Sequence, residues 1–224
     1  MRVSIIMPVL NEAAGIRETL LALESLRGAG CELIIADGGS EDGTAEAAAG
    51  LYDQWVDAPR GRARQMNAGA AAATGELLLF LHADTWLPAD ALQWLERFAA
   101  SNRLWGRFDV RLSGDRPLFR VIAWFMNQRS RLTGVATGDQ AIFVRRSLFE
   151  QVGGYEPIPL MEDVALSKAL RRHSRPYCIR ASVITDNRRW EVNGAWRTIG
   201  LMWRLRWAYW RGTDPEILAR RYRG

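Results

Sequence analysis

The chain has 224 residues and a formal net charge of +5 at pH 7, with 48% hydrophobic and 25% charged residues. This length and composition fit one globular domain, with or without a short appendage, and exclude a disordered or fibrous chain. Lys168 is the only lysine, so arginine carries almost all of the positive charge. Arginine is well suited to binding phosphate through paired hydrogen bonds, although a high arginine content can also reflect genome composition.

The cysteine pattern and the N-terminus indicate where the protein works. Cys31 and Cys178 stand alone, outside any metal-ligand spacing. We therefore expect neither a zinc site nor a disulfide framework, and we expect the protein to work in a reducing compartment. The segment after Met1 lacks the features of a signal peptide, and no stretch is apolar enough to span a bilayer. The sequence predicts a cytoplasmic protein that could also contact the inner face of the membrane peripherally.

Short apolar runs alternate with helical patterns in the first half of the chain. The expected strands are Val3–Met7, Glu32–Ala36, Gln54–Val56 and Leu77–Leu81, and the expected helices are Ala13–Leu26, Thr44–Ala49 and Arg62–Ala73. Apolar strands that alternate with helices are typical of a parallel sheet covered on both faces. We predict an α/β fold with a mainly parallel, Rossmann-like central sheet flanked by helices, which binds ligands beyond the carboxyl ends of its strands.

The second half is less regular. It predicts strands at Trp105–Leu112 and Gln140–Val144, and helices at Phe119–Arg131 and Asp163–His173. We divide the chain into a main α/β domain, residues 1–186, and a helical appendage rich in arginine and tryptophan, residues 187–224.

Polar residues follow three of the expected parallel strands. These residues are Pro8, Asn11 and Glu12 after the first strand, Asp37, Gly38 and Gly39 after the second, and His82, Asp84 and Thr85 after the fourth. Because the carboxyl ends of parallel strands share one edge of a sheet, we expect these side chains to converge. A turn with a helix cap explains residues 38–44 but leaves Asp37 unexplained, so we predict that Asp37 recognises a nucleotide.

Carboxylates and arginines at this edge suit a charged ligand. Alternate residues of the extended segment His82–Asp84 point to the same side, so Asp84 can offer a hard oxygen ligand to Mg²⁺ or Mn²⁺. Arg62 and Arg64 open an expected helix, whose N-terminus suits a diphosphate. Simpler interpretations stay open: Asp84 as an ordinary loop residue, and the helix as an amphipathic surface helix.

Two further polar pairs lie in the second half of the chain. Glu162 and Asp163 precede an expected helix, where acidic residues also act as caps, so capping and catalysis are compatible there. Asp139 and Gln140 precede an expected strand.

Taken in order, these motifs resemble the family-2 glycosyltransferases of GT-A fold. The resemblance covers roughly residues 3–190 and rests on residues 8–12, 36–44, 82–84 and 162–163. It implies that Asp37 binds the base, Glu12 lies near the nucleoside, Asp84 binds Mn²⁺ or Mg²⁺, and Asp163 is the catalytic base. The other expected donor-binding residues are Pro8, Gly38, Arg62, Gln65, Asn67, His82 and Ala83; those expected at the acceptor or diphosphate are Asp139, Gln140, Glu162, Arg189 and Trp190.

The sequence departs from the family pattern at two places. His82 stands at the first position of the usual Asp-x-Asp metal motif, so Asp84 would hold the ion with the diphosphate and water. Asp186 replaces the glutamine of the Gln-x-x-Arg-Trp motif of processive synthases, which weakens any case for processivity. The compact length and the segments around His82 and Gly138 resemble a short bacterial subgroup associated with arsenosugar biosynthesis.

The expected function is inverting, metal-dependent transfer of a sugar from a nucleotide diphosphate donor to an acceptor hydroxyl. A nucleotidyltransferase is the main alternative, but it would typically need a glycine-rich basic loop after the first strand, and Lys168 is remote from that loop. A non-catalytic module that binds nucleic acid or membrane is the other alternative, and it would not need Asp37, Asp84 and Asp163 on one edge.

The C-terminal segment combines tryptophan with arginine. One helical face carries Trp196, Ile199, Gly200, Trp203, Trp207 and Trp210, with Arg197, Arg204 and Arg211 along its flank. This face could bind a membrane surface, although we favour packing on the domain itself or on a second subunit. No nucleic-acid motif accompanies it, so we expect no nucleic-acid partner. Because the face is separate from every donor motif, deletion from about Gly194 is expected to leave the nucleotide site intact.

Overall fold

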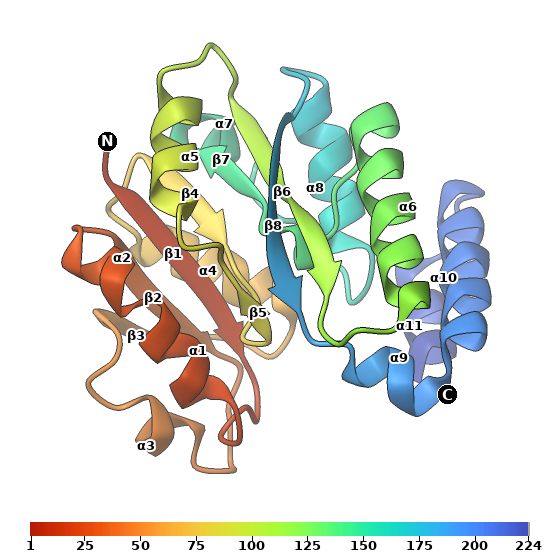
Figure 1. Ribbon diagram of the computed structural model, residues 1–224, viewed down its shortest axis with the longest axis horizontal. Helices are drawn as coiled ribbons and strands as arrows, with labels where there is room; N and C mark the ends of the chain where they lie inside the picture. The colour runs from red at the N-terminus through yellow and green to blue at the C-terminus, as the bar shows by residue number, and fades with distance from the viewer. Residues whose placement is uncertain (224) are drawn as a thin grey trace.

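The computed structural model describes residues 1–223, apart from the side chains at positions 189, 193 and 223. An eight-stranded sheet crosses the molecule in the order β3-β2-β1-β4-β7-β6-β8-β5 (Figure 1). Its strands are β1 (Val3–Val9), β2 (Glu32–Asp37), β3 (Gln54–Asp57), β4 (Leu77–Phe80), β5 (Thr85–Trp86), β6 (Trp105–Leu112), β7 (Phe143–Arg145) and β8 (Tyr177–Thr185).

The sheet is mainly parallel, as the alternating pattern predicts. Strand β1 pairs in parallel with β2 and β4, and β3 extends this parallel half beyond β2. The other half is mixed: β7 runs antiparallel to β4 and β6, β8 runs parallel to β6, and β5 pairs antiparallel with β8. The prediction of a mainly parallel central sheet flanked by helices is confirmed.

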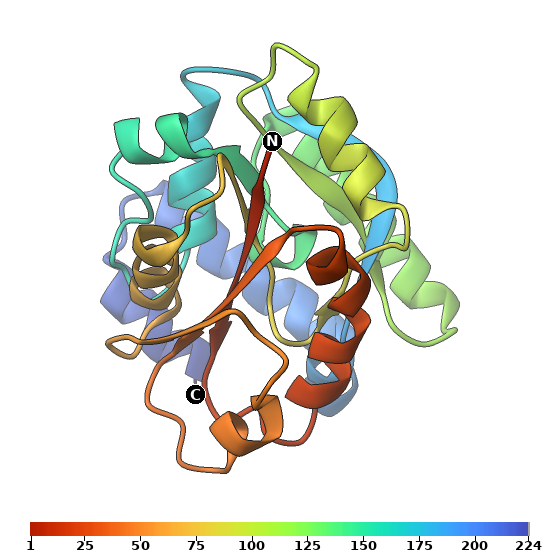
Figure 2. The same cartoon turned by 90° about the vertical axis from the view of Figure 1, so that its left-hand side faces the viewer.

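Helices cover both faces of the sheet (Figure 2). They are α1 (Ile16–Ala22), α2 (Glu24–Gly28), α3 (Thr44–Ala48), α4 (Arg62–Ala72), α5 (Ala91–Ala99), α6 (Pro117–Thr133), α7 (Arg146–Gln151), α8 (Glu162–Arg171), α9 (Arg188–Asn193), α10 (Ala195–Trp210) and α11 (Pro215–Arg223), with a 3₁₀ turn at Gly138–Gln140. Helices α1 and α5 pack on one face of the sheet, and α4, α7 and α8 pack on the other.

The period-two alternation of strand side chains divides the core into two layers. In β1, Ile5 and Met7 join the layer under α1 and α5, whereas Ile6 points to the layer under α4. Helix α4 lies so close to β1 that a Cβ at Gly69 would come within 2.5 Å of the Ile6 side chain. Glycine at this position therefore allows the C-terminal half of α4 to pack closely on β1.

Several elements differ from the sequence prediction. The helix expected at Ala13–Leu26 is two shorter helices that meet at Leu23. The strand expected at Gln140–Val144 begins later, because the Gln140 side chain and the Thr137 hydroxyl bond to each other's backbone and wind residues 138–140 into a 3₁₀ turn. Strands β5 and β8 and helices α5 and α7 were not predicted.

The C-terminal helices pack on the domain around α8. Leu205 of α10 and Leu218 of α11 join Met161 and Val164 in a small apolar cluster. The side of α10 that makes these contacts is opposite to the tryptophans, so the prediction that this face packs on the domain is wrong for them, although Ile199 of the same face packs on the cluster around Phe119. The four tryptophans are exposed: Trp196, Trp203, Trp207 and Trp210 have exposed fractions of 76%, 75%, 61% and 73%. The division at residue 186 stays a prediction, as does a second subunit.

None of the helices within residues 1–223 has both the length and the apolar character needed to cross a bilayer.

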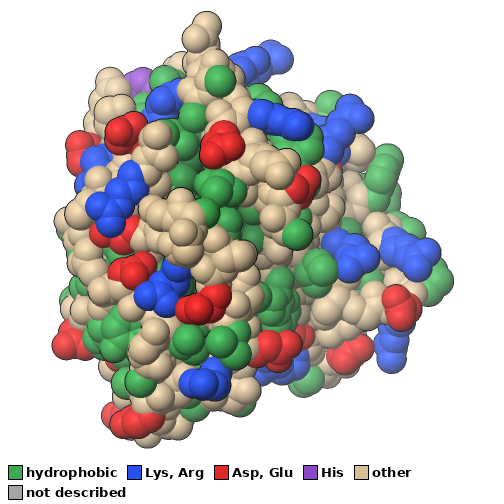
Figure 3. Space-filling view, turned by 60° about the vertical axis from the view of Figure 1, so that its left-hand side comes forward, with side chains coloured by type: hydrophobic (Ala, Val, Ile, Leu, Met, Phe, Trp, Pro, Cys, Tyr) green, Lys and Arg blue, Asp and Glu red, His purple; other side chains and the backbone are tan. Residues whose placement is uncertain are grey.

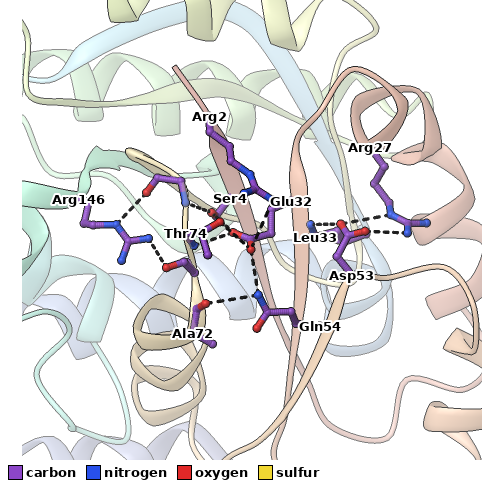
Figure 4. A network of polar contacts seen from close by, with 12 residues as sticks. Arg2, Ser4, Arg27, Glu32, Leu33, Asp53, Gln54, Ala72, Thr74 and Arg146 are labelled. Atoms are coloured by element: carbon purple, nitrogen blue, oxygen red, sulfur yellow. Dashed lines mark hydrogen bonds and ion pairs between the residues drawn. The ribbon is translucent and has the colours of Figure 1, made fainter.

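At the amino end of the sheet, a buried carboxylate ties three segments together (Figure 4). Glu32 accepts hydrogen bonds from the Ser4 hydroxyl, from the backbone N–H and hydroxyl of Thr74, and from the Gln54 amide at 2.9 Å. Burial by itself would raise the pKa of Glu32, but these hydrogen bonds outweigh it and hold the pKa below its usual value of 4.5. The network therefore joins β1, β2, β3 and the start of β4 on the edge opposite to the carboxyl ends.

We predict that Glu32→Ala lowers the free energy of unfolding by about 2–4 kcal/mol at pH 7, because it leaves several buried donors without a partner. Glu18→Ala, at an exposed position of α1, is the control and should change it by less than about 0.5 kcal/mol. Since the pKa of Glu32 is lowered on folding, its contribution is present above pH 4.5 and is lost as the pH falls below that value. Urea unfolding at several pH values measures both effects; an equal loss in the two variants would contradict the assignment.

Candidate active site

A cavity of about 840 Å³ lies beyond the carboxyl ends of β1 and β4, between α4 and the C-terminal helix α11. Its walls come from the loop after β1, the first turn of α4, the loop after β4, the segment before α8, and α11. The lining residues are Pro8, Val9, Leu10, Glu12, Arg60, Gly61, Arg62, Ala63, Arg64, Gln65, His82, Ala83, Asp84, Pro157, Ile158, Pro159, Leu160, Glu162, Glu216, Ala219 and Tyr222. Eight of the predicted site residues thus share one cavity: Pro8, Glu12, Arg62, Gln65, His82, Ala83, Asp84 and Glu162.

The buried Gln65 side chain fixes the floor of this cavity. Its amide nitrogen donates to the carbonyl oxygens of Val9 and Ala36 at 2.6 and 2.9 Å, at the carboxyl ends of β1 and β2. Its amide oxygen accepts a hydrogen bond from the Gly61 N–H at 3.3 Å. Gln65, which was predicted to bind the sugar donor, therefore makes its side-chain hydrogen bonds to backbone groups. These bonds place the N-terminus of α4 beside the two strand ends.

Helix α4 presents positive charge to the cavity. Arg62 and Arg64 are exposed in its first turn, which has no acidic residue, and Arg60 precedes it. The unpaired N–H groups and the dipole at a helix N-terminus favour anions, and arginine adds a planar hydrogen-bonding group. This wall of the cavity is suited to a phosphate chain.

The loop after β1 is held by side chains of the loop after β2. The backbone N–H groups of Asn11, Glu12 and Ala13 donate to Ser40, Thr44 and Asp42 at 2.9, 2.9 and 3.1 Å. The Asn11 amide oxygen accepts a hydrogen bond from the Glu41 N–H in return. These contacts hold Asn11 at a positive φ of 56° and fix the direction in which the next residue, Glu12, enters the cavity.

Asp37 lies at the end of β2 but does not line the cavity. Its carboxylate accepts hydrogen bonds from the Gly39 and Ser40 N–H groups and from the Ser40 hydroxyl. It therefore orders the loop that holds Asn11 and Glu12, and contact with a base stays a prediction. Gly38, also predicted to bind the donor, lies directly against Gln65, where a Cβ would come within 3.0 Å of the amide group.

Two carboxylates, Glu12 and Asp84, line the cavity close enough for their charges to interact. The pKa of Glu12 is raised from its usual 4.5, first by partial burial and then by the negative charge of Asp84. The positive charges of Arg188 and Arg62 counteract this increase. Two neighbouring carboxylates provide the hard oxygen ligands that a divalent cation prefers.

These two residues fit a Mn²⁺ or Mg²⁺ ion that shares its coordination with a ligand. In the part of the chain that the structure describes, no group of three or more His, Cys, Asp or Glu side chains is arranged to hold a metal on its own. Asp84 and Glu12 would thus supply part of the coordination, with diphosphate oxygens and water supplying the rest. His82 is not arranged as a further ligand, because its ring packs against Gly138 and its Nδ1 lies 3.6 Å from Asp139 Oδ1.

Asp163, the predicted catalytic base, lies in the first turn of α8. One of its carboxylate oxygens accepts a hydrogen bond from the Gly138 N–H at 3.0 Å and the other from its neighbour Val164. Gly138 in turn lies against His82, where a Cβ would be 2.4 Å from the imidazole ring. The contact chain Asp163–Gly138–His82 therefore connects α8 to the loop after β4.

The environment of Asp163 raises its pKa to about 6. Burial is the main cause, followed by the negative charge of Glu162, and the two backbone hydrogen bonds partly oppose them. A carboxylate with a pKa near 6 is a stronger base than an ordinary aspartate and is still ionised at neutral pH. Glu162 lines the cavity itself, whereas Asp163 faces Gly138, so the two acids of this pair point in different directions.

The structure does not bring every predicted residue to the cavity. Asn67 uses its side-chain amide to bond both backbone groups of Tyr155, at 2.8 and 2.9 Å, so it anchors the segment before α8. Gln140 is fully buried and bonds to Thr137 and Asn127. Trp190 packs on the cluster around Phe119. Arg189 was predicted to contact the diphosphate, and its side chain lies outside the described residues.

A buried charged cluster beside the site was missed by the sequence analysis. Arg107 and Arg131 both bond to Asp109, and Arg107 is fully buried. Burial lowers the pKa of the neighbouring Arg129, against the charges of Asp163 and Asp139. The alternation of Arg107, Asp109 and Arg111 in an otherwise apolar strand was the available signal. The contribution of α11 was missed because the helical pattern was followed only as far as Trp210.

The family of the chain follows from its sequence similarity. The sequence model described as "Glycosyl transferase family 2" matches residues 4–153, from β1 to just after α7, which include the cavity residues of the loops after β1 and β4 and of α4. The chain belongs to glycosyl transferase family 2. The family prediction is confirmed, and the comparisons do not reach the narrower arsenosugar subgroup, which stays a prediction.

Mycobacterial proteins are among its similar relatives. An uncharacterised glycosyltransferase of Mycobacterium tuberculosis is 33% identical over 165 residues, which cover 69% of this chain and 62% of the relative. A "PGL/p-HBAD biosynthesis glycosyltransferase" of Mycobacterium bovis is 32% identical over 177 residues, which cover 68% of this chain and 62% of the relative. The chain thus spans less than two thirds of the length of these relatives.

Solved GT-A glycosyltransferases share the fold of this family-2 protein. A mannosyltransferase of Pyrobaculum calidifontis, in complex with GDP-Man and Mn²⁺, has a TM-score of 0.63 at 22% identity and covers 82% of this chain and 56% of its own. TarS of S. aureus, in complex with UDP-GlcNAc, has a TM-score of 0.68 at 16% identity, and the match covers 83% of this chain and 58% of TarS. Glucosyl-3-phosphoglycerate synthase of M. tuberculosis, in complex with Mn²⁺ and UDP, has a TM-score of 0.61 at 18% identity. The match covers 81% of this chain and 70% of the synthase. The GT-A fold prediction is confirmed.

The position of α11 changes what is expected from the C-terminal segment. Because Tyr222 lines the cavity, Tyr222→Ala should weaken binding of a nucleoside diphosphate with Mn²⁺ roughly tenfold, about the effect of one lost side-chain contact. A truncation after Gly212 should weaken it further. Trp196→Ala, at an exposed position outside the cavity, is the control. Thermal shift and titration calorimetry measure binding; unchanged affinity in both the Tyr222 variant and a folded truncation would restore the view that the tail is separate from the site.

Proposed function

We propose that this family-2 protein transfers a sugar from a nucleoside diphosphate donor to an acceptor hydroxyl, with a divalent cation and with inversion at the anomeric carbon. The observation that carries the proposal is the arrangement of the cavity. The arginines of α4 form one wall, the Glu12–Asp84 pair lies at the strand ends, and α8 brings Glu162 to the cavity with Asp163, a carboxylate of raised pKa, next to it in the chain. The GDP-Man and UDP-GlcNAc complexes of the Pyrobaculum and S. aureus structures support the same type of ligand.

The donor would lie with its diphosphate against the first turn of α4. Arg62 and Arg64 are free of acidic neighbours in that turn and reach the negative charge that develops as the sugar leaves. Glu12 would lie near the nucleoside, where a carboxylate can accept hydrogen bonds from ribose hydroxyls. Asp37 acts at least through the loop it orders, and we propose that it also lies near the base.

The divalent cation would be held by Asp84, with Glu12 close by and the diphosphate completing the coordination. Such an ion supplies charge stabilisation for a leaving diphosphate. The bound cation would also offset the mutual repulsion of Glu12 and Asp84, which lowers the free-energy cost of holding the two carboxylates close together.

We propose that Asp163 removes the proton of the acceptor hydroxyl. As the acceptor oxygen bonds to the anomeric carbon, its proton passes to the Asp163 carboxylate and the bond from that carbon to the diphosphate oxygen breaks. A base and a leaving group on opposite faces of the sugar give inversion in a single displacement. Gly138 holds one Asp163 oxygen in place through its N–H, and this hydrogen bond survives transfer of the proton to the other oxygen.

A panel of UDP-, GDP- and dTDP-sugars, incubated with and without Mn²⁺, tests the activity. We expect slow Mn²⁺-dependent release of a nucleoside diphosphate from one donor even before the acceptor is known. Release of pyrophosphate from a nucleoside triphosphate would instead indicate the nucleotidyltransferase alternative. No turnover of any donor, together with no thermal shift by nucleoside diphosphates, would contradict the proposal.

Asp84→Ala should abolish the increase in donor affinity that Mn²⁺ produces, because it removes the carboxylate proposed to bind the ion. The fold should persist, since Asp84 is a half-buried loop residue. Calorimetric titration of nucleoside diphosphate with and without Mn²⁺ measures the effect. Asp90→Ala, an exposed acid at the start of α5, is the control. Unchanged Mn²⁺ dependence in Asp84→Ala would rule out this residue as the ligand.

Asp163→Asn should keep donor affinity while kcat falls by roughly 10²–10⁴-fold, because the amide has the shape of the acid but cannot accept the proton. In the wild type the base is inactive when protonated, so kcat/KM should fall below about pH 6 and level off above it. The variant should lose this pH dependence. Glu162→Gln separates the two acids: it should alter KM more than kcat. Near-normal turnover in Asp163→Asn would refute the assignment.

A further inference from the structure

Helix α10 is apolar on two opposite sides, and only one of them is covered. Leu205 on the inner side is 2% exposed and packs with α8 and α11. The outer side carries Trp196, Trp203, Trp207 and Trp210, each more than 60% exposed. At 100° per residue these four positions fall within about 60° of one another, so they form a single stripe along the helix. Four exposed tryptophans in one line are costly in water and indicate a partner.

Basic residues flank this stripe on one side. Arg197, Arg204 and Arg211 are exposed, and the Arg211 guanidinium lies 5.1 Å from the ring centroid of Trp207. Helix α10 contains no aspartate or glutamate. On the face shown in Figure 3, by contrast, acidic and basic side chains are interspersed. The charge of α10 is therefore of one sign, next to its apolar stripe.

The neighbouring helix α6 extends the same kind of surface. Val121, Trp124, Phe125 and Leu132 are exposed along one side of it, and its sequence also lacks acidic residues. Helix α6 contacts the start of α10 through the cluster that includes Ile122 and Ile199. Both helices lie on the side of the molecule away from β3 (Figure 1). We call the exposed aromatic residues of α6 and α10, together with the three flanking arginines, the tryptophan surface.

We propose that the tryptophan surface binds the protein to the surface of an anionic lipid bilayer. Tryptophan prefers the boundary between headgroups and acyl chains, where its ring is buried and its N–H stays hydrated. Arginine stems can lie along that boundary while the guanidinium groups reach anionic headgroups. Helix α10 would lie in the plane of the interface with its inner side on the domain, which agrees with the absence of a spanning helix in residues 1–223.

The charge pattern favours a lipid surface over a second copy of the chain. In a twofold-symmetric dimer the same patch contacts itself, so the arginines of one copy would face those of the other or lie beside them. No acidic residue of α6 or α10 could offset that repulsion. An anionic bilayer complements both parts of the surface at once.

Sedimentation with vesicles tests the proposal on the full chain. Wild-type protein should bind vesicles of phosphatidylcholine mixed with phosphatidylglycerol, bind pure phosphatidylcholine weakly, and lose binding as salt rises. Trp203→Ser/Trp207→Ser should reduce partitioning at least roughly tenfold, since two rings no longer insert. Arg197→Gln/Arg204→Gln should reduce binding to the anionic vesicles roughly 30-fold and leave binding to phosphatidylcholine unchanged.

The control variant Arg17→Gln/Arg97→Gln removes the same charge from α1 and α5, and it should bind anionic vesicles within about twofold of wild type. Light scattering after size exclusion gives the oligomeric state of each variant. Wild-type protein that stays in the supernatant with anionic vesicles would overturn the proposal. If it is also dimeric, and the Trp203/Trp207 variant is monomeric, the tryptophan surface is a subunit interface instead.

Discussion

The architecture of the site depends on one amide side chain. Gln65 bonds to the carbonyl oxygens at the ends of β1 and β2 and to the backbone before α4, so it brings two strand ends and a helix N-terminus together. Parallel strands leave their last carbonyl groups without partners at the edge where they end, and buried polar groups of this kind must be satisfied. The same three hydrogen bonds set the position of the α4 arginines relative to the strand ends, and therefore the shape of the cavity.

Two of the non-glycine residues with positive φ directly precede acids of the cavity. Asn11 precedes Glu12, and Met161, with φ of 70°, precedes Glu162. Such conformations cost free energy and persist when the surrounding contacts determine them. Here the contacts are the hydrogen bonds from the loop after β2 and the apolar cluster around Met161. The fold holds these like charges together, and under the proposed function a bound cation would offset the repulsion between them.

The sequence predicts the parallel half of the sheet and the residues at its strand ends because both follow from local pattern and from the geometry of parallel strands. It does not separate amides that bind a ligand from amides that bind backbone: Gln65, Asn67 and Gln140 are all used by the backbone. It also leaves open whether the tryptophan face packs on the domain, on a second subunit or on a membrane, because hydrophobicity along α10 does not tell which of two apolar sides is covered. The role of α11 depends on a contact between distant parts of the chain, which periodicity cannot show.

A crystal structure of the protein with a nucleoside diphosphate and Mn²⁺ tests the central claim most directly, that the carboxyl ends of β1 and β4 and the first turn of α4 form one donor site. The account predicts anomalous density for Mn²⁺ beside Asp84, a diphosphate between the ion and Arg62 or Arg64, and Asp163 on the side away from the leaving oxygen. Density for the nucleotide elsewhere, or a Mn²⁺ ion bound without contact to Asp84, would contradict it.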